Sequence, residues 1–177
     1  MNVSSRILPV IAFVSFLVGP GVSHGQDTKR ENVGDTAAIS IPANWNRIEN
    51  QDLAFLAGNP EDTASVTILE EKTADIEITD LAEYYEASLD QLKAQYPDFK
   101  ANPVKEGEIS GMKAMFTTAE ATFKNGEKAV PSKMYLMMLK NEKAGSFYLI
   151  MALSSPRLFD SKKGELMEVL KSFAEKP

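Results

Sequence analysis

Three extended segments that follow one another limit what this chain can fold into more than any other feature of its sequence. They lie within residues 112–154 and read AMFTTAEATF, KMYLMMLK and SFYLIMALS. Asn125-Gly126 lies between the first two segments, and Asn-Gly is typical of a type I′ hairpin turn, whose central residues need positive φ. A short polar loop, residues 141–145, separates the second from the third. The stretch predicts an antiparallel meander of three long strands.

Apolar residues occupy both faces of the second and third segments. In the second segment, Met134, Leu136 and Met138 face one way, and Tyr135, Met137 and Leu139 face the other. Both faces of such strands must be covered. The first segment carries Glu120 and several threonines on one face, so we expect it to be half exposed. The meander is therefore predicted to be the middle layer of a sandwich.

Two helices are predicted to cover this sheet. The first runs from about Asp80 to Tyr96, with Asp80 as the N-cap and Glu83 as its capping-box partner. Its apolar positions recur at three- and four-residue steps, at Leu81, Tyr84, Tyr85, Leu89, Leu92 and Tyr96. The second helix is expected to be capped by Asp160 or Ser161. Its apolar face comprises Leu166, Val169, Leu170 and Phe173.

Further strands are predicted on the N-terminal side of the meander, at residues 37–41, 53–57, 64–70 and 104–109. The fold class is thus α+β. The expected architecture is an α/β/α sandwich with an antiparallel sheet of about six to seven strands, one helix after the first strands and one at the C-terminus.

The N-terminus, residues 1–25, has the features of a secretory signal peptide. Arg6 precedes an apolar run over residues 7–18, and Ser23 and Gly25 suit the −3 and −1 positions of a cleavage site. An uncleaved membrane anchor is the alternative, but the apolar run is shorter than the roughly 20 residues that a spanning helix needs. We therefore expect export to the periplasm or the extracellular space. Residues 26–35 are predicted to be a flexible lead-in, and residues 36–177 a single domain.

The composition excludes several kinds of chemistry. The chain has no cysteine, and its one histidine, His24, lies within the predicted signal peptide. The mature chain then has no residue for Ser-His-Asp or Cys-His catalysis, nor the usual zinc ligands. The formal net charge is −6 without a basic stretch, which excludes nucleic acid as a partner. We expect no catalytic residue, no cofactor and no metal.

Carboxylates and methionines are the remaining candidates for a site. Glu70-Glu71 and the helix acids Asp80, Glu83 and Glu86 are interpreted as solvated charges, because nothing places two of them in one cleft. Six methionines lie in or beside the meander, and core filling is the simplest interpretation. Cu(I) binding and a Met- and aromatic-lined pocket for an apolar ligand are the alternatives.

Trp45 is the single tryptophan and follows a proline turn, with Asn44 and Arg47 beside it. One interpretation is a core anchor at the edge of the sandwich. The functional interpretation is an exposed partner-binding site made of Asn44, Trp45 and Arg47, because Trp and Arg are frequent in interface hot spots.

The succession of motifs resembles that of the PsbP-like and DcrB-like proteins. The segment Ile39-Ser40-Ile41-Pro42-Ala43-Asn44-Trp45 is similar to their "IPxxW" opening. Residues 109–114 are similar to their "L-x-G-x-x-A" element, and residues 166–173 to their closing helix with its terminal Ser-Phe.

This resemblance implies an exported α/β/α sandwich without catalytic residues shared across the family. Members of the plant and cyanobacterial branch assist the oxygen-evolving photosystem. The mature chain lacks histidines of the kind that this branch uses near metal, so that role is not carried over.

Three functions remain open. The leading hypothesis is a non-enzymatic exported protein that binds another protein of the envelope or secretory space, or assists assembly there. The alternative is a carrier of a small apolar ligand in a Met- and aromatic-lined pocket. The third is a carboxylate-based hydrolase, which would need two carboxyl groups that converge in a cleft.

Overall fold

The computed structural model describes residues 27–125 and 128–176. The strands are β1 (Thr28–Val33), β2 (Ala37–Pro42), β3 (Asn46–Arg47), β4 (Phe55–Gly58), β5 (Ala64–Lys72), β6 (Lys100–Ala101), β7 (Lys105–Ile109), β8 (Met112–Asn125), β9 (Lys128–Asn141), β10 (Ser146–Ser154) and β11 (Ala174–Glu175). The helices are α1 (Leu81–Gln95) and α2 (Pro156–Lys171), with a 3₁₀ turn at Thr73–Asp75.

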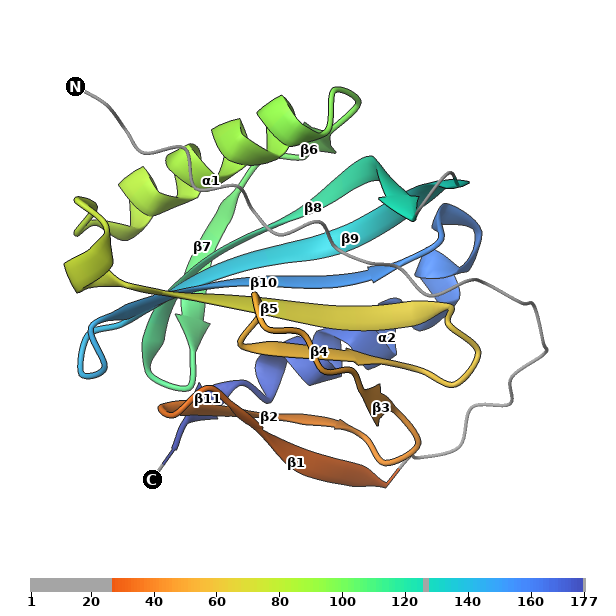
Figure 1. Ribbon diagram of the computed structural model, residues 1–177, viewed down its shortest axis with the longest axis horizontal. Helices are drawn as coiled ribbons and strands as arrows, with labels where there is room; N and C mark the ends of the chain where they lie inside the picture. Colours follow the sequence, from red (N-terminus) through yellow and green to blue (C-terminus); the bar gives the residue numbers. More distant parts are fainter. Residues whose placement is uncertain (1–26, 126–127, 177) are drawn as a thin grey trace.

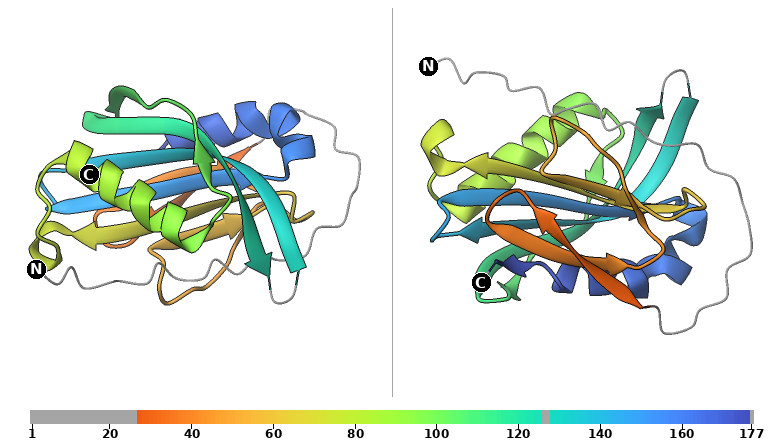
Figure 2. Two further views of the ribbon diagram at one scale, coloured as in Figure 1. Left: turned by 90° about the horizontal axis from the view of Figure 1, so that it is seen from above. Right: turned by 60° about the horizontal axis from the view of Figure 1, so that its bottom comes forward.

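These elements form three layers around one large antiparallel sheet (Figures 1 and 2). The large sheet has eight strands in the order β3-β4-β5-β10-β9-β8-β6, with β7 also paired to β8. Helix α1 covers one face, and α2 together with a small sheet, β1-β2-β11, covers the other. The predicted α/β/α sandwich is confirmed, although the large sheet has more strands than expected and the small sheet was not foreseen.

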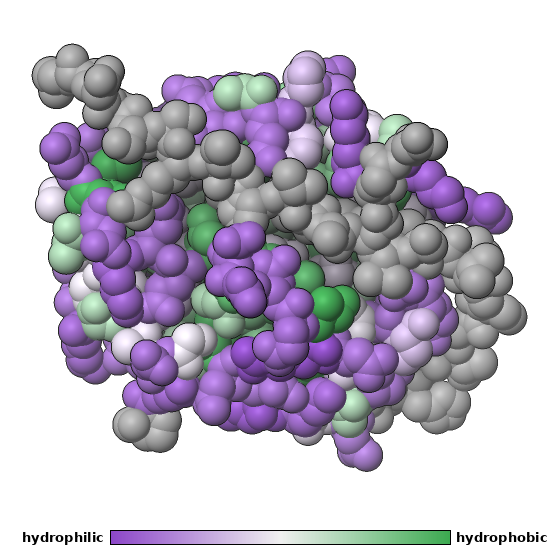
Figure 3. Space-filling model, viewed as in Figure 1, coloured by the Kyte–Doolittle hydropathy of each residue, from purple (hydrophilic) through white to green (hydrophobic). Residues whose placement is uncertain are grey.

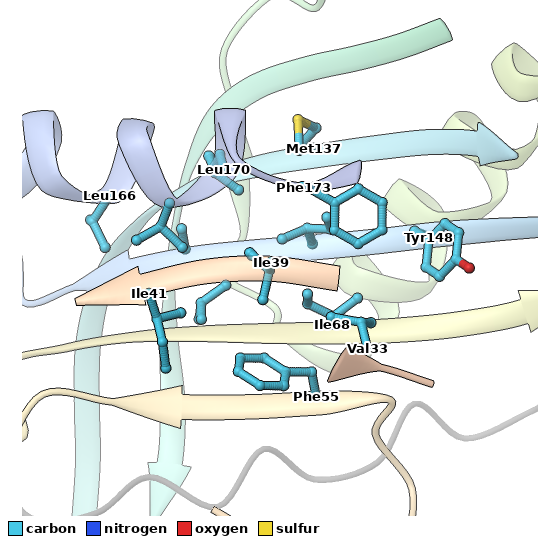
Figure 4. Close-up of a cluster of buried hydrophobic side chains, with 14 of the residues drawn as sticks. Val33, Ile39, Ile41, Phe55, Ile68, Met137, Tyr148, Leu166, Leu170 and Phe173 are labelled. Carbon is cyan, nitrogen blue, oxygen red and sulfur yellow. The ribbon is translucent and has the colours of Figure 1, made fainter. Parts of the chain in front are cut away.

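Two hydrophobic cores lie on opposite faces of the large sheet. The core on the α2 side joins the small sheet to the large one, and Figure 4 shows side chains such as Ile39, Ile68, Leu170 and Phe173 converging there. The core on the α1 side packs that helix onto β8, β9 and β10. A middle sheet with apolar residues on both faces is what two such cores require.

The meander forms as the sequence indicates. Strand β10 is buried along all nine residues, and β8 pairs with β9 from Ala114↔Leu139 to Asn125↔Lys128. Met134 and Met138 lie in the α1-side core, whereas Met137 lies in the α2-side core, as the alternation predicts. The hairpin is confirmed, but its turn type concerns residues 126–127, which lie outside the described part of the chain.

The first helix matches its predicted range and N-cap, and the second begins earlier than predicted. Asp80 caps α1 by accepting hydrogen bonds from the backbone N–H groups of Ala82 and Glu83. Helix α2 starts at Pro156, and Ser155 is its N-cap, so capping by Asp160 or Ser161 is wrong. Proline fits the first helical position because that residue needs no N–H partner. The expected buried face of α2, including Leu166 and Leu170, is confirmed.

The expectation of a flexible lead-in over residues 26–35 is wrong for residues 28–33. These residues form β1, which pairs with β2 from Thr28↔Pro42 to Val33↔Ala37. Strand β1 is polar because it is an edge strand whose apolar contribution to the core is its last residue, Val33. The predicted signal peptide, residues 1–25, lies outside the described residues.

Candidate functional site

Trp45 lies in the core rather than on the surface. Its side chain is only 1% exposed and belongs to the α2-side hydrophobic core. The turn that the sequence indicated delivers the ring inward, and the backbone N–H of Trp45 donates to the carbonyl of Pro42 at 2.9 Å. The interpretation as a core anchor is confirmed, and an exposed aromatic contact at Trp45 is wrong because the ring is fully covered.

Arg47 is held in place on three sides. Its Nη1 donates to the carbonyl oxygen of Asn32 in β1 at 3.0 Å. The guanidinium lies 5.2 Å from the centre of the Phe55 ring and within 4 Å of carboxylate oxygens of Glu31 and Glu49. The side chain nevertheless stays 36% exposed. Arg47 therefore links the edge strand β3 to the small sheet while part of its guanidinium faces the solvent.

Asn44 is exposed and lies two residues before β3. We call Asn44 and Arg47, above the buried Trp45, the rim. Figure 3 shows that hydrophilic residues dominate the lower part of this face, over β1, while hydrophobic residues gather in its middle. Partner binding at the rim stays a prediction, with two surface residues instead of three.

A polar cluster around Glu70 was not foreseen from the sequence. Glu70 Oε1 accepts hydrogen bonds from Lys72 at 2.6 Å, Ser146 at 3.0 Å, Tyr148 at 3.2 Å and Thr36 at 3.3 Å. The Glu70 side chain is only 12% exposed, so the interpretation as a solvated charge is wrong for this residue. We call these five residues the Glu70 cluster.

The Glu70 cluster shifts the pKa values of its members. Burial alone would raise the pKa of Glu70, but the hydrogen bonds from Lys72, Ser146 and Tyr148 and the charge of Lys72 outweigh it, so the pKa is lowered. Burial, and then the negative charge of Glu70, raises the pKa of Tyr148 to about 12. The cluster is thus a charged carboxylate with a neutral phenol as one of its donors.

The Glu70 cluster fastens the small sheet to the large one. Thr36 lies in the β1–β2 turn, whereas Glu70 belongs to β5 and Tyr148 to β10. Gly34 in the same turn has φ of 52°, and a Cβ on it would overlap with Oε2 of Glu70. The Tyr148 ring also packs edge-on against Phe173, with centroids 4.9 Å apart. This network has the geometry of a structural tie, and the hydroxyl groups of Ser146 and Tyr148 belong to buried residues.

The second carboxylate of the Glu70-Glu71 pair lies on the other face of β5. Glu71 accepts a hydrogen bond at 2.8 Å from the hydroxyl of Tyr84 in α1. The Tyr84 ring stacks on Phe147, with centroids 4.4 Å apart. Because adjacent strand residues point to opposite faces, the two carboxylates do not converge in one cleft. This geometry removes the pair as a candidate for carboxylate-based hydrolysis.

The partners of Glu70 could not be identified without the strand register. Glu70 and Lys72 stand at i and i+2 and therefore share a face, a signal that the sequence does contain. Their contacts to Ser146 and Tyr148 depend on the pairing of β5 with β10, in which Lys72 lies opposite Ser146 and Glu70 opposite Tyr148.

The methionines of the meander are all packed in the cores. Met115, Met134, Met138 and Met151 lie on the α1 side, and Met112 and Met137 lie on the α2 side. This distribution over opposite faces matches the interpretation as core filling. Within residues 27–125 and 128–176, no group of three or more His, Cys, Asp or Glu side chains is placed to hold a metal ion. No helix in the described ranges is long and apolar enough to cross a membrane.

The fold defines a class of α+β sandwich proteins, in which one antiparallel sheet lies between a helix and a second layer of helix and strands. No known family model matches the sequence, and no curated protein matches it either. The similarity to known proteins is therefore found in the structure.

Many solved structures share this fold, and three of them illustrate it. The cyanobacterial PsbP (CyanoP) of Synechocystis sp. PCC 6803 has a TM-score of 0.63 at 10% identity, over 90% of this chain and 98% of that one. LpqN of Mycobacterium tuberculosis, involved in cell envelope biogenesis, has a TM-score of 0.58 at 13% identity, over 87% and 93%. The Ran-binding protein Mog1p of Saccharomyces cerevisiae has a TM-score of 0.58 at 11% identity, over 84% and 95%. The chain has the PsbP-like fold that its motifs indicated.

Proposed function

We propose that this chain is an exported, non-enzymatic protein that binds another protein of the envelope or secretory space and has an accessory role there. Proteins with this fold include a Ran-binding protein and a protein involved in cell envelope biogenesis. These roles belong to the neighbours, and they support a binding role for the fold rather than a reaction. The N-terminal sequence supports export.

The main support for this proposal is the rim, where contacts within the protein hold Arg47 in place. Its contacts to Asn32, Glu31 and Phe55 fix the guanidinium before any partner arrives, while 36% of the side chain stays accessible. A pre-organised side chain loses little conformational entropy on binding, and arginine is frequent in interface hot spots. Asn44 beside it adds an exposed amide that can donate and accept hydrogen bonds.

Site-specific cross-linking tests this proposal in the host cell. A photo-reactive amino acid at position 44 of the full chain should capture one defined protein. The substitution Arg47→Gln should reduce the captured amount at least about fivefold, because it removes a charged contact worth about 1 kcal/mol or more. A second photo-reactive chain, with the probe at the exposed Lys93 on α1, is the matched control and should not capture the same protein.

Thermal unfolding of Arg47→Gln must be recorded as well, because Arg47 also ties β3 to β1. A variant with an unchanged folded population and reduced capture supports the proposal. Equal capture from positions 44 and 93, or capture that ignores Arg47→Gln, would show that the rim is not the binding site. Trp45→Ala is unsuitable here because a buried tryptophan contributes about 3–5 kcal/mol to stability.

Transport of a small apolar ligand is the second candidate function. The hydroxyl of Thr67 is buried and has no hydrogen-bond partner among the described residues, and Thr67 pairs across the sheet with Leu56 and Met151. An apolar ligand with one polar group would satisfy this hydroxyl. Native mass spectrometry of the protein from its own host should then show an adduct that Thr67→Val diminishes, whereas an adduct-free protein would exclude a carrier.

A further inference from the structure

The open strand edges of the two sheets differ in how well they are protected. An open edge can take up another strand, and proteins usually prevent this with short strands, prolines, charged side chains or covering groups. Strand β3 has only two residues, and Arg47 donates to the outward side of β1 at Asn32. Strand β9 extends beyond its pairing with β10, which ends at Lys133, and Pro131 lies in that extension. Proline leaves no N–H there for an incoming strand.

Among the described residues, the protection of strand β7 is limited to its charged side chains. The strand has five residues, contains no proline, and pairs with β8 along one side only. Residues 100–108 are all exposed, and Val104, just before the strand, is 38% exposed. Strand β7 stands at the opposite end of the strand order from β3, so this edge is remote from the rim.

The turn after β7 determines which backbone groups face outward. Ser110 and Gly111 have φ of 51° and 82°, as in the two-residue turn of a tight hairpin, and Ile109 pairs with Met112. In such an antiparallel ladder, alternate residues direct their backbone N–H and C=O groups toward the paired strand, and the residues between them direct these groups away from it. Counting back from Ile109, Glu106 and Glu108 direct their N–H and C=O groups to the open edge.

The side chains along this edge set the chemistry of an incoming strand. Glu106 and Glu108 share one face of β7, and neither forms an ion pair among the described residues, although Lys113 of β8 lies opposite Glu108. Gly107 lies between them on the other face, where the ring of Phe116 comes within 3.2 Å of the place of a Cβ. An incoming strand would therefore meet two carboxylates on one face, and the Phe116 ring with the exposed Lys105 on the other.

We propose that the β7 edge binds an extended segment of a partner protein in which two basic residues flank an apolar one. The basic residues lie opposite Glu106 and Glu108, and the apolar residue lies against Phe116. A second copy of the chain is a poor occupant, because antiparallel pairing centred on Gly107 would place Glu106 opposite Glu108 of the copy. Opposite charges across a strand pair stabilise it, and like charges destabilise it. This surface is additional to the rim.

Fluorescence anisotropy with a short labelled peptide of alternating lysine and valine tests the proposal on the full chain. The peptide should bind, and a matched peptide of alternating glutamate and valine should not. The double substitution Glu106→Gln, Glu108→Gln should weaken binding about tenfold, since it removes two cross-strand charge pairs. Glu106→Pro should weaken it by a similar factor, because it removes one outward N–H that the fold does not use.

Glu49→Gln is the control that removes a carboxylate at the opposite end of the sheet, and it should leave peptide binding unchanged. The double glutamine variant keeps the experiment decisive if Glu106→Pro fails to fold. Absence of peptide binding, equal binding of the glutamate peptide, or an equal effect of Glu49→Gln would overturn the proposal. None of these results affects the cross-linking experiment at position 44, so the proposal for the β7 edge and the proposal for the rim can be refuted independently.

Discussion

Glu70 and Glu71 are neighbours on β5, yet their carboxylates lie in different surroundings on opposite faces of the sheet. Glu70 accepts hydrogen bonds from four side chains, including the Lys72 ammonium group. Among described residues, Glu71 accepts from one side chain, Tyr84. The first carboxylate connects two sheets, whereas the second fixes the start of one helix.

The comparison shows how one strand can anchor two layers by different means. On the α1 side, apolar contacts and the stacking of Tyr84 on Phe147 provide most of the attachment. On the α2 side, the β1–β2 turn has little apolar surface of its own, and Gly34 and Thr36 reach the large sheet through Glu70. We expect the Glu70 face to depend on charge and the Glu71 face to depend on burial.

The largest expected difference is between two alanine substitutions. Glu70→Ala should lower the free energy of unfolding by about 3 kcal/mol, because it leaves buried donors without their acceptor. Glu71→Ala should lower it by about 1.5 kcal/mol, since only one hydrogen bond to this carboxylate, from the Tyr84 hydroxyl, is lost. Urea denaturation of both variants measures these values. Equal losses would show that the two glutamates have equivalent roles.

Alkaline pH provides a second test, of the phenol in the Glu70 cluster. Because the pKa of Tyr148 rises to about 12 on folding, the folded state keeps its proton after the unfolded state has lost it. Stability contributed by this group should therefore fall between about pH 10 and 12, by about 2.7 kcal/mol in total. Tyr148→Phe should make that part of the profile less steep, measured by denaturation at each pH, while the raised pKa values of Tyr84, Tyr85 and Tyr96 continue to contribute to the slope. An unchanged slope would contradict a raised pKa at this position.

Gly34 tests how closely the turn is fitted to the carboxylate. Gly34→Ala should cost about 1.5 kcal/mol, from the positive φ and from the overlap of the new Cβ with Glu70. In the Glu70→Ala background the cost should fall to about 1 kcal/mol, because the backbone term remains and the overlap is gone. A double-mutant cycle by urea denaturation separates the two terms. If the two losses in the free energy of unfolding simply add, Gly34 and Glu70 do not interact.

The sequence predicted the elements that have strong hydrophobic periodicity. Strands β5, β8, β9 and β10, the face of α1 and the assignment of Met134 and Met137 to opposite cores all follow from alternation and helical spacing. Strand β1 could not be recognised, because an edge strand with one buried residue has no apolar pattern. The start of α2 was placed too late because acidic and serine residues inside the first turns resembled a cap.

The candidate sites were harder to predict because they depend on long-range contacts. Thr36 and Glu70 are 34 residues apart, and Thr36 and Tyr148 are 112 residues apart, so only the assembled sheets bring them together. For Trp45, in contrast, part of the local structure could be predicted. Its proline turn was recognisable, but the direction of the ring depends on the layer that covers it, and local sequence does not contain that information.

Acid pH is expected to produce the smallest effect and distinguishes a charged Glu70 from a neutral one. The pKa of Glu70 is lowered from its usual 4.5, so its contribution is complete above that value and is lost as the pH falls through the folded-state pKa. Glu70→Gln should have a lower free energy of unfolding than the natural chain at pH 7. This difference should become smaller as the pH falls below about 4.5. Glu71→Gln is the matched control. A difference in free energy of unfolding that stays constant with pH would mean that the charge of Glu70 does not help to hold the β1–β2 turn.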